Sequence, residues 1–180
     1  MFPLSLAPLS RSLAATVLAG ALSLTFAWQP AAATELAIQP PGDLAVATLI
    51  SAEQALLGLT NADRIANGVA PLDSDPDMLQ IARQRAATQI DAPSLSHYTA
   101  DGDLAFVKLL ANAQVKYQLA GENLARAYDG DASVIQRIEL ALMGSPAHRK
   151  NILDGTFNRV AIGAASNGAG QITFAEVYRD

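Results

Sequence analysis

The last fifth of the chain carries the pattern that most constrains its fold, a pair of extended segments joined by a turn. Val160 to Ala164 is a short apolar run, and Gln171 to Tyr178 is typical of a second strand. Between them, Ser166 to Gly170 is rich in Asn and Gly, which accept turn conformations. This pattern predicts an antiparallel hairpin. Leu119 to Tyr128 is a further candidate strand.

Helical signals occupy the sequence before the hairpin. Ser51 to Gln54 fits a capping box, and Gly68 is a natural stop for the helix that follows. A second helix is predicted to start at Asp75-Pro76, a cap followed by proline at the first helical position. Apolar residues recur every four positions along it: Met78, Ala82, Ala86 and Ile90. Arg83 and Arg85 are expected to point away from that stripe.

Two further helices are predicted, with Asp103 and Asp131 as their caps. The second of these carries an apolar stripe: Val134, Ile138 and Leu142. Ser145 and Pro146 resemble the cap and first residue of one more short helix. Helices that precede strands, without repeated strand–helix–strand units, favour an α+β fold in which helices cover an antiparallel sheet.

The start of the chain is typical of an exported protein. Leu13 to Trp28 contains no charged residue, and Ala31-Ala32-Ala33 fits a signal-peptidase site. We therefore expect a signal peptide over residues 1–33, a linker over 34–48 and one domain over 49–180. The apolar run is short for a membrane span, which needs roughly 20 residues. Secretion is the favoured expectation, and an uncleaved N-terminal membrane anchor is the alternative.

Charge and cysteine content exclude several classes of function. The formal net charge is −5, which argues against nucleic acid or an anionic membrane as partners, because both reward clustered Lys and Arg. The chain contains no cysteine, so disulfides, thiolate zinc sites and cysteine nucleophiles are excluded. We expect a monomer.

The chain has two histidines, and each lies in a segment that could present it. His97 precedes the turn Asp101-Gly102, and His148 falls in the first turn of the predicted short helix, whose positive end disfavours an imidazolium. Between them comes Gly121-Glu122-Asn123. Two imidazoles and a carboxylate can bind a divalent metal or perform acid–base chemistry. Each residue taken alone is more often structural or exposed than functional, so the hypothesis depends on the fold bringing them together.

In their order and spacing these segments resemble the CAP superfamily of cysteine-rich secretory, antigen 5 and pathogenesis-related proteins, and most closely its bacterial SCP-like branch. The resemblance runs from about Leu56 to Tyr178. It rests on these segments: Leu59 to Arg64, Ser96-His97, Gly121-Glu122-Asn123, Ser145 to Leu153 and Ile162-Gly163. It implies a three-layer α-β-α sandwich with a central antiparallel sheet. It also implies a surface cleft where two histidines and two acidic residues bind zinc or another divalent cation.

By motif, His97, Glu122 and His148 match three of those four metal-site positions. The fourth does not match, because Ser145 stands where an acidic residue is usual. Glu176 in the last strand is a possible fourth ligand, although strand alternation leaves its direction open. The resemblance implies a secreted domain that binds a lipid, a cell-wall component or a protein. A metal-assisted hydrolase and a purely structural His/Glu network are the alternatives.

Overall fold

The computed structural model describes residues 41–128, 133–167 and 169–180. The predicted signal peptide over 1–33 and the predicted cap Asp131 lie outside the described residues. The elements follow in this order: α1 (Pro41–Ala66), β1 (Asp73–Ser74), α2 (Pro76–Gln89), α3 (Ala105–Asn112), β2 (Ala120–Tyr128), α4 (Val134–Gly144), α5 (Pro146–Ile152), β3 (Arg159–Ser166) and β4 (Gln171–Arg179).

The four strands form one sheet in the order β1-β3-β4-β2. The predicted hairpin is confirmed as the antiparallel pair β3 and β4, and the candidate strand before it is confirmed as β2, antiparallel to β4. The register of that second pair sets Asn123 opposite Glu176. The two-residue strand β1 is an unpredicted parallel addition to β3. β2 is therefore an edge strand.

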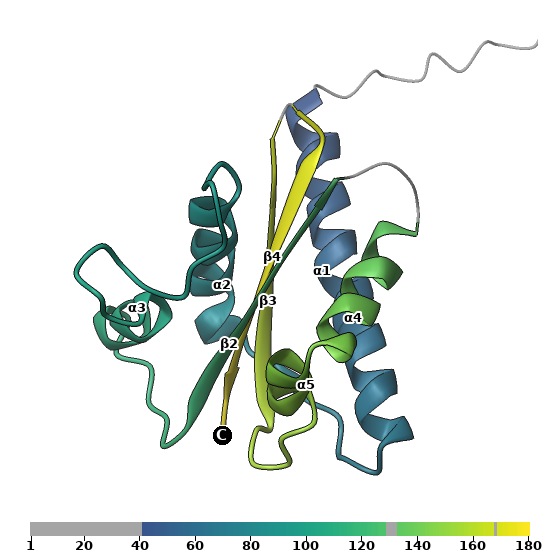
Figure 1. The fold of residues 1–180 in the computed structure, drawn as a ribbon, viewed down its shortest axis with the longest axis vertical. Helices are drawn as coiled ribbons and strands as arrows, with labels where there is room; N and C mark the ends of the chain where they lie inside the picture. Colours follow the sequence, from purple (N-terminus) through teal and green to yellow (C-terminus); the bar gives the residue numbers. More distant parts are fainter. Residues whose placement is uncertain (1–40, 129–132, 168) are drawn as a thin grey trace, which may run out of the picture. The chain divides into compact units, whose positions relative to one another are not determined.

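Helices cover both faces of the sheet, which confirms the α-β-α sandwich (Figure 1). α2 and α3 lie on one face, whereas α1, α4 and α5 lie on the other (Figure 1). α2 packs very closely on β3, because a Cβ added at Gly163 would lie 2.1 Å from the backbone nitrogen of Arg83. This close approach fixes the distance between α2 and the sheet. It thereby sets how far the α2 side chains that point at β2 must reach.

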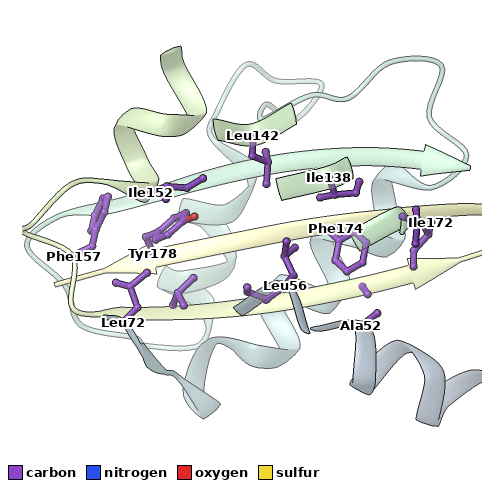
Figure 2. Packing of buried hydrophobic residues seen from close by; sticks show 14 residues of the cluster. Ala52, Leu56, Leu72, Ile138, Leu142, Ile152, Phe157, Ile172, Phe174 and Tyr178 are labelled. Atoms are coloured by element: carbon purple, nitrogen blue, oxygen red, sulfur yellow. The ribbon is translucent and has the colours of Figure 1, made fainter. Parts of the chain in front are cut away.

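The larger core lies between the sheet and α1, α4 and α5 (Figure 2). Leu56 of α1, Leu142 of α4 and Phe174 of β4 are fully or almost fully buried there, and Tyr178 stacks on Phe157 with ring centroids 5.4 Å apart. A smaller core under α2 and α3 contains Met78, Phe106 and Val177, among others. The apolar stripes predicted for α2 and α4 are all buried, as expected.

Helix α1 begins earlier than expected, at Pro41, so residues 41–48 of the predicted linker are helical. Proline is compatible with the first turn of a helix, because the N–H it lacks would have no partner there. Ser51 therefore lies inside the helix and is not its cap, and Glu53 turns into the fold, where it accepts the Ala164 N–H at 3.0 Å. Among the described residues, no helix is both long and apolar enough to cross a membrane.

The other predicted caps meet mixed outcomes. Asp75 caps α2, accepting the Asp77 N–H at 2.9 Å. Asp103 does not cap α3, which begins after Leu104. Its carboxylate instead accepts from the Lys108 ammonium at 3.0 Å. A β-bridge between Tyr98 and Leu104 sets the backbone just before the helix. Ser145 precedes α5 as expected, but its side chain makes no capping hydrogen bond.

Candidate functional site

Glu122 is the centre of the candidate site. It lies on the face of β2 that α2 covers, and only 5% of its surface is exposed. Arg85 of α2 meets its carboxylate with two contacts, Nε to Oε1 at 2.6 Å and Nη2 to Oε2 at 3.1 Å. A forked guanidinium–carboxylate pair is among the stronger charged contacts in proteins, and it neutralises the buried carboxylate.

Arg85 therefore contradicts the expectation that it points away from the buried face of α2. It is 3% exposed. The apolar period of the helix does not report this burial, because the guanidinium is compensated by a residue 37 positions away rather than by solvent. Arg83, which was also expected to point away from the stripe, is partly exposed and pairs with Glu53 at 2.6 Å.

His97 donates or accepts a hydrogen bond through Nδ1 with Glu122 Oε2, at 2.8 Å. Its side chain is 37% exposed, so the ring lies at the surface with one edge on the buried carboxylate. The loop that carries it is held from two sides, because Arg85 Nη2 donates to the Ser96 carbonyl at 2.7 Å and the Ala105 N–H donates to the His97 carbonyl at 2.8 Å. The same guanidinium thus fixes both the histidine loop and the carboxylate that orients the ring.

His148 lies in the first turn of α5, as predicted, and borders a groove beside β2 and α4. Burial lowers the pKa of His148, and the charge of His97 lowers it further. The predicted neutral imidazole therefore arises first from burial and then from the neighbouring histidine. Asn123 Nδ2 contacts the His148 carbonyl at 3.3 Å, which ties α5 to β2.

Glu176 does not join the two histidines. It stands opposite Asn123 in the strand register, on the sheet face that α1 and α4 cover, and is 1% exposed. Its Oε2 accepts hydrogen bonds from the Tyr178 hydroxyl at 2.5 Å and from Asn123 Nδ2 at 3.0 Å. The structure thus joins His97 to Glu122 by a hydrogen bond and places the possible fourth acid, Glu176, on the opposite face of the sheet.

A second buried carboxyl group, Glu139 of α4, approaches Glu176 through a shared hydroxyl. The Thr60 Oγ1 lies 3.0 Å from Glu139 Oε2 and 3.3 Å from Glu176 Oε1. A hydroxyl has one proton to donate, so at most one of these contacts uses it and the other requires a proton on the carboxyl group. Burial, followed by the charge of Glu176, raises the pKa of Glu139 to about 8. Burial also raises the pKa of Glu176.

Sequence reasoning passed over Arg85, Thr60, Glu139 and Tyr178. The signal for Glu139 was present, because it stands three residues before Leu142 on the apolar side of α4. A charged residue at such a position requires a buried partner. Among the described residues, no group of three His, Asp or Glu side chains is arranged to hold a metal ion. Both oxygens of Glu122 already accept hydrogen bonds from Arg85. The two imidazoles therefore remain as the available metal ligands.

Comparison of the sequence with known proteins identifies its family. The model of the cysteine-rich secretory protein family (CAP) matches residues 57–178. The uncharacterized protein YkwD of Bacillus subtilis is 29% identical over 117 residues, covering 65% of this chain and 44% of YkwD. The chain thus spans less than half the length of that curated relative.

Solved structures resemble the fold. An extracellular SCP-domain protein of Bacillus anthracis aligns with a TM-score of 0.58 at 24% identity, covering 72% of this chain and 40% of the other. An outer surface protein of Borrelia burgdorferi aligns with a TM-score of 0.60 at 14% identity, covering 72% of this chain and 92% of the other. At these identities the likeness concerns the fold.

Proposed function

We propose, from the premise that the chain belongs to the cysteine-rich secretory protein (CAP) family, that it is an exported domain whose two histidines bind a divalent metal ion. Its role in this proposal is extracellular binding of a lipid, cell-wall or protein ligand. The observation that carries the metal site is the 2.8 Å contact between His97 Nδ1 and the Glu122 carboxylate.

The donor chemistry fits such an ion. A carboxylate at Nδ1 favours the tautomer with the proton on Nδ1, which leaves the Nε2 lone pair of His97 free to bind; metal-binding histidines commonly have such a carboxylate partner. The lowered pKa of His148 keeps the second imidazole neutral, as a ligand must be. Two imidazole nitrogens suit zinc or a similar transition metal, with water completing the coordination. The ion would supply Lewis acidity, and the side chains bind and orient.

Glu122 acts in this proposal as a positioning residue for His97 and not as a third ligand. Arg85 occupies both of its oxygens, so a metal ion would have to displace a buried ion pair to reach it. The same pairing argues for binding over hydrolysis, because a general base needs a carboxylate that can accept a proton from water.

The two-histidine composition makes the test unusually clear, because each imidazole gives an assignable NMR signal. We expect zinc titration of ¹⁵N-labelled protein to shift both Nε2 resonances while Nδ1 of His97 stays protonated. His97→Ala and His148→Ala should each lower zinc affinity at least about tenfold, and Glu122→Gln should lower it about 10–100-fold, as losses of orienting carboxylates do. Asp101→Asn, an exposed change near His97, is the matched control.

Imidazole signals that stay unmoved by zinc, copper and nickel would contradict the proposal. If His97→Ala then also lowered the melting temperature, the His/Glu cluster would be a structural network. Export has its own test, in which the full chain is expressed in a bacterium and the secreted product is analysed by mass spectrometry. We expect a mature N-terminus at Thr34, and intact residues 1–33 on a membrane-bound product would favour the anchor.

A further inference from the structure

We propose that Asn151 is a positioning residue for His148, because it clamps the turn of α5 that carries this histidine to β2. The inference rests on the proposed function and deepens it, because it names a side chain on which the second imidazole depends. Within the described part of the chain, the His148 ring makes no hydrogen bond. The place of the imidazole is therefore set by the backbone of α5, a helix of seven residues.

Two asparagine side chains, Asn151 of α5 and Asn123 of β2, form an amide clamp between the helix and the strand. Asn151 follows His148 by three positions and so lies on the same face of the helix. Its Nδ2 donates to Asn123 Oδ1 at 2.9 Å and to the Glu122 carbonyl at 3.3 Å, which uses both of its protons. Asn123 Nδ2 returns a contact to the His148 carbonyl at 3.3 Å. The shortest contact of the clamp is therefore donated by Asn151.

The tripeptide Gly121-Glu122-Asn123 fits this clamp at each of its three positions. Gly121 leaves the space that Asn151 needs, because a Cβ there would lie 3.4 Å from Asn151 Oδ1 and 3.1 Å from the Phe157 ring. Glu122 supplies its backbone carbonyl, and Asn123 supplies its side-chain oxygen. The motif thus holds α5 through groups other than the Glu122 carboxylate.

A separate anchor holds the far end of α5. Ile152 is fully buried in the larger core (Figure 2), and Arg64 Nη1 donates to its carbonyl at 2.6 Å. Among the described residues, every hydrogen bond between α5 and another element involves Arg64, Asn123 or Asn151. Loss of the Asn151 amide therefore leaves the helix attached at Ile152, while the His148 turn keeps only the longer contact from Asn123.

The first test uses metal-free protein, so that it does not depend on zinc. We expect Asn151→Ala to lower the amide hydrogen-exchange protection factors of Arg149 and Ile152 at least about fivefold, as the loss of one or two hydrogen bonds does. Asn151→Asp keeps the shape but has no proton to donate, so it should give the same loss and serves as a second variant. Lys150→Ala is the matched control, because Lys150 is an exposed residue of the same helix.

The second test is a zinc titration of the imidazole NMR signals. Asn151→Ala should lower zinc affinity at least about tenfold, as losses of residues that orient ligands do. Because Asn151 acts through His148, the double variant Asn151→Ala/His148→Ala should bind zinc within about twofold of His148→Ala alone. A merely structural residue would lower the affinity of both backgrounds by the same factor. Lys150→Ala should bind zinc like the wild type.

Unchanged protection factors in α5 of both Asn151 variants would overturn the inference. So would a further loss of at least about fivefold in the double variant, because Asn151 would then act independently of His148. Wild-type imidazole signals that zinc leaves unmoved would contradict the proposed function instead. In that case lowered protection in metal-free Asn151→Ala would still support the clamp, and unchanged protection would refute it.

Discussion

Glu139→Gln is expected to stabilise the protein at neutral pH and to remove part of its pH dependence. The folded state raises the pKa of Glu139 from 4.5 to about 8, by burial, by the charge of Glu176 and by a smaller contribution from Asp63. Between these pH values the folded protein holds one proton more than the unfolded chain. The free energy of unfolding therefore falls by about 1.4 kcal/mol per pH unit across this window.

The total loss reaches about 5 kcal/mol at pH 8 and then stays constant, because above that pH the residue is ionised in both states. At pH 7 the loss is about 3 kcal/mol. A glutamine has no proton to lose and can still accept from the Thr60 hydroxyl. The variant should thus match the wild type below pH 4.5 and exceed it by about 3 kcal/mol at pH 7.

Urea denaturation followed by circular dichroism from pH 4 to 8.5 measures this difference. Other carboxyl groups titrate in both proteins, so the quantity to plot is the free energy of the variant minus that of the wild type. Asp101→Asn removes one exposed negative charge and should give a difference near zero at every pH. A Glu139→Gln difference that is flat between pH 4.5 and 8 would refute the reasoning, because the residue would then share one pKa in both states.

Three further variants, together with one control variant, test the contacts that hold the site and the layers. Arg85→Met should lower the free energy of unfolding by about 3–5 kcal/mol in urea titrations, because it leaves the Glu122 charge buried without a partner. Gly163→Ala should destabilise by at least about 1–3 kcal/mol, because the new Cβ meets the backbone of α2. Gly58→Ala is the control, because a Cβ at Gly58 meets nothing within 4 Å. This variant should raise the free energy of unfolding by roughly 1 kcal/mol, the opposite sign to Gly163→Ala. Arg64→Met should cost about 3 kcal/mol or more by thermal melting, because the guanidinium donates to four backbone carbonyls.

Local signals carried most of the fold. The turn between Ser166 and Gly170 predicted the hairpin, and Asp75-Pro76 predicted the first turn of α2, because in both places the backbone conformation depends on residues a few positions apart. The start of α1 and the entry to α3 were not predictable in this way. The backbone before Ala105 is set by a bridge between Tyr98 and Leu104, which a cap motif at Asp103 does not encode.

In the site, too, short-range signals were predictive and long-range contacts were not. Motif order identified His97 and Glu122, and the structure places them 2.8 Å apart. Arg85 was missed, because helical periodicity counts a charged residue as exposed unless its partner is known. Glu139 and Glu176 were missed as a pair for the same reason. The contact between Glu176 and Thr60 joins residues 116 positions apart, and short-range sequence patterns do not predict such a contact.

The tripeptide Gly121-Glu122-Asn123 shows why a short motif can build a two-sided site. Successive residues of a strand point to opposite faces, so Glu122 reaches Arg85 and the His97 loop on the α2 side, whereas Asn123 turns to the α4 side. There Asn123 donates to Glu176 and approaches the His148 carbonyl. One strand edge therefore positions both histidines through adjacent side chains. The single amide of Asn123 thus contacts both the His148 carbonyl of α5 and the buried Glu176 carboxyl group.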